Sequence, residues 1–119
     1  MARPRLVASF VGLALLCATV LTGCSHQDAS ALANQACSKV ERGLAAERQA
    51  ASAGPLQASR LRTEALGYIR AALPLAAVAA GEDTTWQALD ATLSESNRVP
   101  IHFLLPALAA QCAGVSGGG

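Results

Sequence analysis

Aromatic residues are scarce in this sequence: they make up only 3% of its 119 residues, although hydrophobic residues together reach 52%. The apolar side chains are therefore largely those of alanine and leucine, which are good helix formers and weak strand formers. A chain of this length forms at most one domain. The composition accordingly predicts an all-α protein.

An excess of charge is lacking as well. The chain has nine basic and eight acidic residues, and the counts become seven and eight when Arg3 and Arg5 of the predicted leader (residues 1–23) are set aside. Proteins that bind nucleic acids concentrate positive charge to neutralise phosphates. We therefore expect no nucleic-acid partner.

Constellations typical of catalysis, metal binding and cofactor binding are also missing. The two histidines, His26 and His102, are not at a ligand spacing from any cysteine, and neither is well supplied with the partners of a catalytic triad. Glu82 and Asp83 are adjacent acids at the expected start of a helix, where negative charge interacts favourably with the helix dipole. No Gly-rich phosphate loop and no haem-attachment motif occurs. We expect no catalytic residue, no metal and no cofactor.

What the sequence does contain is the organisation of an export signal at its start. Residues 1–5 are short and basic, and residues 6–21 form an uncharged apolar run. This run is shorter than the roughly 20 apolar residues of a transmembrane helix, and a basic front end is typical of a secretory signal. An uncleaved anchor helix is the alternative.

The four residues Leu21-Thr22-Gly23-Cys24 resemble the lipobox of bacterial lipoproteins. The resemblance implies that diacylglycerol is attached to the Cys24 thiol, that the leader is cut between Gly23 and Cys24, and that the new amino terminus receives a fatty acid such as palmitate. It also implies that the protein is secreted and then held by lipid on the extracytoplasmic face of a bacterial membrane. The resemblance covers residues 1–24 only. It implies a cellular location and implies no activity.

The remaining cysteines predict a disulfide. Cys17 follows two leucines, lacks the small residue of a lipobox, and is lost with the leader, while Cys24 carries lipid. Cys37 and Cys112 are left, and two cysteines in an exported domain suggest one disulfide. Closing so long a loop stabilises a small domain by on the order of 4 kcal/mol in the chain-entropy account. Two buried free thiols are the alternative.

Apolar periodicity predicts four helices, at residues 29–53, 56–80, 84 to about 97, and 101–113. Gly54 and Pro55 have the order typical of a helix end. Pro74 is expected to kink or split the second helix. Thr84 and Gln87 match a capping box, in which Thr84 is the cap. Gly114 is expected to end the last helix.

These helices predict a small antiparallel four-helix bundle with one disulfide, preceded by a cleaved signal peptide. In an up-down-up-down bundle the start of the first helix and the end of the fourth share one end, which fits a bond between Cys37 and Cys112. The connections at Gly54 and Asn97 are then expected at the opposite, far end. The expected divisions are a signal peptide (1–23), a lipidated tether (24–28), a helical domain (29–114) and a flexible tail (115–119).

Two groups of side chains could form a binding surface. Tyr68 and Trp86 lie at helical core spacing and are expected to pack in the core, with a ligand-binding box as the alternative. Arg60, Arg62 and Arg70 are expected to form a basic face on the second helix, which is either solvated or meets anionic lipid or an acidic polymer. His102 is expected at the surface or at the rim of the bundle.

Together these features predict a membrane-anchored, non-catalytic binding or interaction module of the cell envelope. Its expected partners are the membrane, through lipid on Cys24, and an envelope protein that meets a surface or a groove near the prolines. A carrier that holds an apolar ligand or lipid between kinked helices is the alternative, and an enzyme ranks third.

Overall fold

The computed structural model describes residues 28–116, which form helices and contain no strand. In chain order the helices are α2 (Ala29–Ser52), α3 (Pro55–Glu82), the 3₁₀ helix η1 (Thr84–Trp86), α4 (Gln87–Glu95), the 3₁₀ helix η2 (Ile101–Phe103) and α5 (Leu105–Ser116). The predicted all-α class is confirmed. The predictions for the leader, Cys24 and His26 lie outside the described residues.

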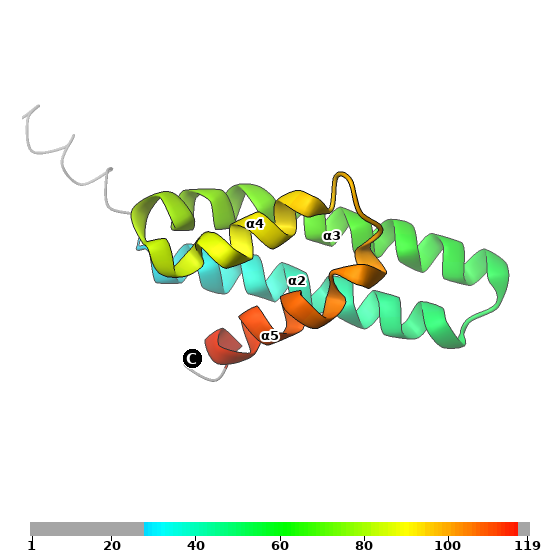
Figure 1. Cartoon of the computed structure of the whole chain (residues 1–119). Coiled ribbons are helices and arrows are strands. Elements are labelled where there is room, and N and C mark those ends of the chain that lie inside the picture. The colour runs from blue at the N-terminus through cyan, green and yellow to red at the C-terminus, as the bar shows by residue number, and fades with distance from the viewer. Residues whose placement is uncertain (1–27, 117–119) are drawn as a thin grey trace, which may run out of the picture.

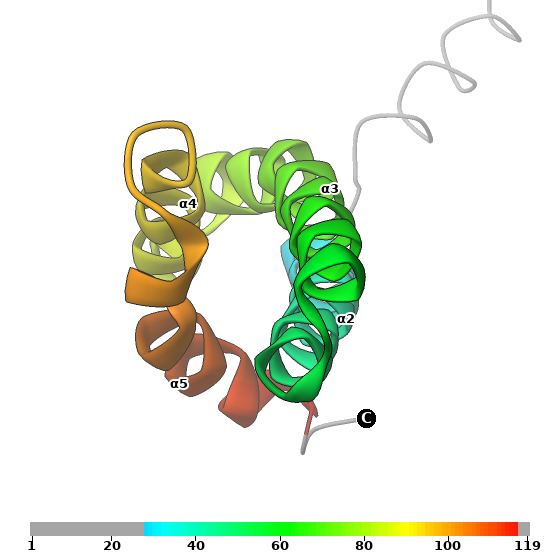
Figure 2. The same cartoon turned by 90° about the vertical axis from the view of Figure 1, so that its right-hand side faces the viewer.

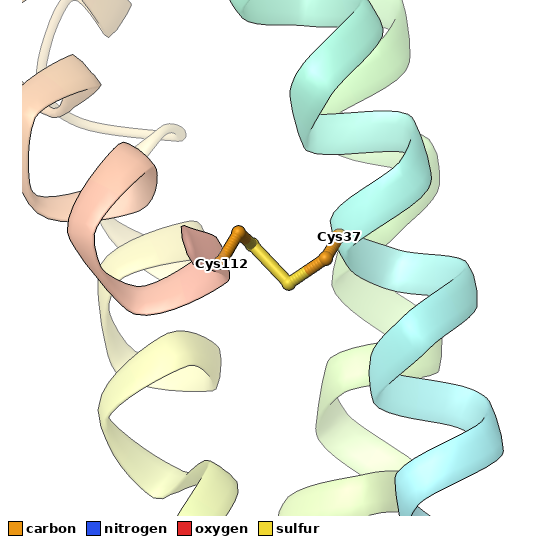
Figure 3. Close-up of a disulfide and its surroundings, with 2 residues drawn as sticks. All are labelled: Cys37 and Cys112. Atoms are coloured by element: carbon orange, nitrogen blue, oxygen red, sulfur yellow. A yellow bond between two sulfur atoms is a disulfide. The ribbon is translucent and has the colours of Figure 1, made fainter. Parts of the chain in front are cut away.

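The four α-helices of this part of the chain form an antiparallel bundle. Seen along the bundle axis, α2, α3, α4 and α5 follow one another around a ring, and α5 returns to lie next to α2 (Figure 2). The Cys37–Cys112 disulfide closes the ring, with 5.3 Å between the two α-carbons (Figure 3). The predicted bundle topology and the predicted disulfide are both confirmed.

The core is made of small aliphatic side chains arranged around this disulfide. Both cysteines are only 2% exposed, and they lie in one cluster with residues from all four α-helices. The largest fully buried side chains of that cluster, besides the cysteines, are Val40, Ile69, Leu93 and Leu108. The disulfide therefore occupies the place that a pair of buried apolar side chains would otherwise fill.

Helices α2 and α3 pack closely because small residues line their interface. A β-carbon added to Gly43 of α2 would lie 3.0 Å from Ile69 Cδ1 and 3.2 Å from the Ala65 carbonyl oxygen of α3. Buried alanines continue the interface on both sides of Gly43: Ala33, Ala36, Ala46 and Ala50 on α2 and Ala58, Ala65, Ala72, Ala76 and Ala79 on α3. The two backbones can therefore approach one another along most of the hairpin.

Pro74 was expected to kink or split the second helix, and the split does not occur, because α3 runs unbroken from Pro55 to Glu82. A proline removes the N–H group that would bond to the carbonyl four residues earlier, here that of Arg70. Both residues lie on the exposed face of the helix, where water can hydrate that carbonyl. The loss of one hydrogen bond is therefore tolerated.

The predicted capping box is also wrong. Asp83, one residue before Thr84, is the cap, and its Oδ1 accepts a hydrogen bond of 2.9 Å from the Thr85 backbone N–H. This bond favours the ionised carboxylate and holds the pKa of Asp83 below its ordinary value. Helix α5 likewise continues past Gly114, the expected stop, to Ser116.

The two halves of the bundle differ in length. Helices α2 and α3 have 24 and 28 residues, whereas α4 and α5 have 9 and 12. The α2–α3 hairpin consequently projects well beyond the turn that joins α4 to η2 (Figure 1). Gly54 and Asn97 therefore do not share one end as expected: Asn97 lies beside the body of the hairpin, where it lines the same hollow as Glu47 and Arg62.

Replacing both Cys37 and Cys112 by alanine should lower the free energy of unfolding by about 4 kcal/mol, because the unfolded chain loses a cross-link between residues 75 apart in sequence. Urea unfolding of the oxidised wild type and the double variant measures the difference, with circular dichroism to verify that both start helical. A difference below about 1 kcal/mol would show that packing alone holds α5 against α2.

Gly43→Leu should destabilise the protein by about 1–3 kcal/mol, since the new side chain has to displace Ile69 or separate the two helices. Gly67→Leu is the matched control. No atom lies within 4 Å of a β-carbon built there, and leucine is the better helix former, so this variant should be neutral or more stable. Equal effects at the two positions in thermal unfolding would contradict the close packing of α2 and α3.

Candidate functional site

One hollow on the described residues is a groove that forms where the short half of the bundle ends. It has a volume of about 930 Å³ and lies between the α2–α3 hairpin and the turn that follows α4. We call it the hairpin groove. It is lined by Glu47, Arg48 and Ala51 of α2, Arg62 and Leu66 of α3, residues 96–102, and Leu105 of α5.

The floor of the hairpin groove is apolar. Ile101 is buried in the core cluster, and Leu66 and Leu105 are partly buried and pack against that cluster. Val99 and Pro100 continue the apolar surface toward solvent. The floor is thus the outer edge of the hydrophobic core, which the shorter helices leave uncovered on this side.

The rim of the groove carries positive charge. Arg48 from α2, Arg62 from α3 and Arg98 from the turn all line it and all are exposed, while Glu47 is the one carboxylate among the lining residues. Arg98 forms an ion pair with Glu95, one turn earlier. Within residues 28–116, no carboxylate lies within ion-pair distance of Arg48 or Arg62. Two guanidinium groups are therefore available to an anionic ligand.

His102 lies at the same rim, as expected for a surface histidine. It is exposed, and its ring lies tilted by 41° against that of Phe103, with 4.1 Å between the ring centroids. Phe103 is itself 68% exposed. Phe103 does not line the groove, so its exposed ring adds apolar surface beyond it.

The groove does not assemble the parts of a hydrolytic site. Its one serine, Ser96, is buried, and its hydroxyl donates a hydrogen bond of 2.6 Å to the Leu93 carbonyl oxygen rather than to His102. Among residues 28–116 no group of three histidine, cysteine or acidic residues is placed to hold a metal ion. The apolar floor and arginine rim of the groove offer apolar contact and charge-assisted hydrogen bonds.

A second, smaller hollow of about 400 Å³ lies near the start of α2 and the end of α5. Trp86 lines it and packs against the core cluster around the disulfide and against a smaller cluster of Leu32, Ala33 and Ala79, as expected of a core residue. The Trp86 Nε1 and Gln111 Oε1 atoms are buried without a hydrogen-bond partner in the described part of the chain, although Gln111 Nε2 donates to Thr92 Oγ1. All residues that line this hollow are uncharged, so it lacks the groups that would fix an ionic ligand.

Only part of the predicted basic face lines the hairpin groove. Of Arg60, Arg62 and Arg70, all exposed on α3, only Arg62 lines the hairpin groove. Its partners Arg48 and Arg98 come from other segments and were missed, because reasoning along a single helix does not reveal which segments meet. Arg48 and Arg62, which both line the groove, thus come from the two different helices of the α2–α3 hairpin rather than from one helix.

Tyr68 is not in the core as expected. It is half-buried, and the Arg42 guanidinium lies 6.0 Å from the centre of its ring. This distance is at the limit of a cation–π contact. Tyr68 therefore belongs to the outer edge of the α2–α3 interface and contributes nothing to the groove.

No protein-family model matches this chain, and the searches of curated proteins and of solved structures found no similar protein. None of the helices in residues 28–116 is long and apolar enough to cross a membrane.

Proposed function

We propose that this protein is a lipid-anchored, non-catalytic binding module of the bacterial cell envelope, and that the hairpin groove is its binding surface. The observation that carries the proposal is the groove itself, in which an apolar floor adjoins two arginines, Arg48 and Arg62, that have no carboxylate partner among residues 28–116. Apolar surface with a few placed polar groups is the usual composition of a recognition site.

The anchor follows from the lipobox resemblance at Leu21 to Cys24 and orients the groove. Lipid on Cys24 would hold the chain four residues before Asp28, the residue that caps α2. Arg48 lies 19 residues beyond Ala29, or roughly 28 Å along the helix at 1.5 Å per residue. With α2 directed away from the membrane, the groove would be presented to the space beyond the lipid surface.

The groove supports a binding module better than a carrier. A carrier between kinked helices would require a cavity beside the proline, and Pro74 lines neither of the hollows described above. The hairpin groove is open to solvent, so a ligand would lie on the surface of the bundle. Such a surface suits a partner whose own bulk covers the exposed side of the contact.

The anchor is tested by intact mass spectrometry of the mature protein from bacterial membranes. We expect a chain that begins at Cys24 and carries the added mass of two or three acyl chains. Cys24→Ser should leave an unprocessed, unlipidated precursor, whereas Cys17→Ser, the control in the leader, should be processed normally. An amino terminus before residue 24 on the wild-type protein would rule out the anchor.

The groove is tested by site-directed photo-crosslinking of the acylated protein in its own envelope. A photoreactive residue in place of Asn97, which is exposed and lines the groove, should give a discrete adduct. The same residue in place of Gln57, which is exposed near the hairpin tip and lies outside the groove, should give none. Equal adducts at both positions would mean that the groove is not the binding surface.

A further inference from the structure

The groups that line the hairpin groove define the kind of ligand that it accepts. Arg48 and Arg62 project from neighbouring helices, and Arg98 adds a third guanidinium that is already paired with Glu95. The chain after the leader is close to neutral, with seven basic and eight acidic residues, yet three of those seven basic residues line this one hollow. The positive charge is therefore a local property of the groove.

The floor adds a second requirement. Leu66, Ile101 and Leu105 present a continuous edge of the core, and Val99 and Pro100 extend it. A ligand has to cover this apolar surface and place anionic groups at the rim. A guanidinium is planar and forms paired hydrogen bonds with carboxylates, which suits it to acidic side chains that follow an apolar stripe.

We propose that the occupant of the hairpin groove is an acidic amphipathic segment of a partner protein. Its apolar side lies on Leu66, Ile101 and Leu105, and its carboxylates meet Arg48 and Arg62, in the manner of a helix that lies in an apolar groove. The proposal rests on the proposed function, since it names the ligand of the same groove.

Two observations favour a protein segment over an anionic lipid. The groove is open to solvent, so an acyl chain placed in it would stay exposed on one side, whereas the apolar side of an amphipathic helix is covered by the rest of that helix. The groove is also roughly 28 Å along α2 from the anchored end, while the tether between Cys24 and Asp28 spans about 14 Å at most. With the bundle upright, lipids of the anchoring membrane are out of reach.

The experiment uses the mature, lipidated chain in nanodiscs of zwitterionic lipid. The probe is a fluorescent synthetic helical peptide with leucine on one face and glutamate on the other, and its counterpart has every glutamate replaced by glutamine. Fluorescence anisotropy should show binding of the glutamate peptide, weakened by salt, and little binding of the glutamine peptide.

The decisive pair of variants removes two positive charges inside the groove and, as the control, two positive charges outside it. Arg48→Gln with Arg62→Gln should weaken binding of the glutamate peptide about tenfold, the effect of losing two exposed charge pairs. The control, Arg60→Gln with Arg70→Gln, removes two exposed arginines of α3 outside the groove and should leave binding within about twofold of the wild type. Both variants should unfold at the wild-type temperature, because none of the four arginines is buried.

Several results would overturn the proposal. Equal weakening by both double variants would indicate general charge attraction, and equal binding of both peptides would assign recognition to the floor alone. Vesicles containing phosphatidylglycerol that bind through Arg48 and Arg62, together with no peptide binding, would make the ligand a lipid headgroup. Absence of peptide binding while the Asn97 adduct persists would refute only the ligand class. Loss of that adduct would refute the proposed function.

Discussion

The Cys37–Cys112 bond fixes the position of the short half of the bundle against the long half. Helix α5 has only 12 residues, and the disulfide is its covalent link to α2. Because the two helices are antiparallel, Leu105, seven residues before Cys112, lies near the level of Leu44, seven residues after Cys37. The turn before α5 then lies beside Glu47 and Arg48. The register set by the disulfide therefore determines that the groove forms beside Glu47 and Arg48 of α2.

The α2–α3 hairpin supplies the fixed wall of that groove. Its interface is rich in small residues, Gly43 and buried alanines, whose side chains lose no rotamer freedom on burial and let the helix backbones approach closely. A glycine inside a helix costs about 1 kcal/mol relative to alanine, and the close contact with Ile69 and Ala65 offsets that cost here. With only two phenylalanines, one tyrosine and one tryptophan in the chain, the core relies on this proximity and on the disulfide rather than on large aromatic side chains.

Most of the fold could be predicted from apolar periodicity, turn residues and cysteine pairing, because each of these signals is local or allows only one partner. The four helices, the turn at Gly54 and the disulfide could be predicted in this way. The cap at Asp83 could not be separated from Thr84, since adjacent residues of both types cap helices well. The approach at Gly43 was missed because it depends on which residue of α3 faces that glycine.

The groove was beyond sequence reasoning for a further reason: it exists because helix lengths differ. A sequence that predicts four helices does not show how far each extends past its neighbours, and a difference of one turn moves a connection by about 5 Å. Arg48, Arg62 and Arg98 become neighbours of one hollow only after α4 ends at Glu95 and the chain turns back beside the hairpin. Their association is a tertiary property, whereas the basic face along α3 was a property of one helix.

The anchor and the groove together suggest how weak recognition could suffice. An open groove with two or three charge contacts at an exposed rim gains little free energy from those contacts, because exposed ion pairs add little each. A lipid on Cys24 would confine the module to the same surface as its partner and raise the effective concentration of the groove, so that low intrinsic affinity gives high occupancy. In this arrangement the disulfide, which keeps the groove preorganised, limits the entropy lost on binding. The stability of so small a bundle and the affinity of its groove would then depend on the same covalent bond.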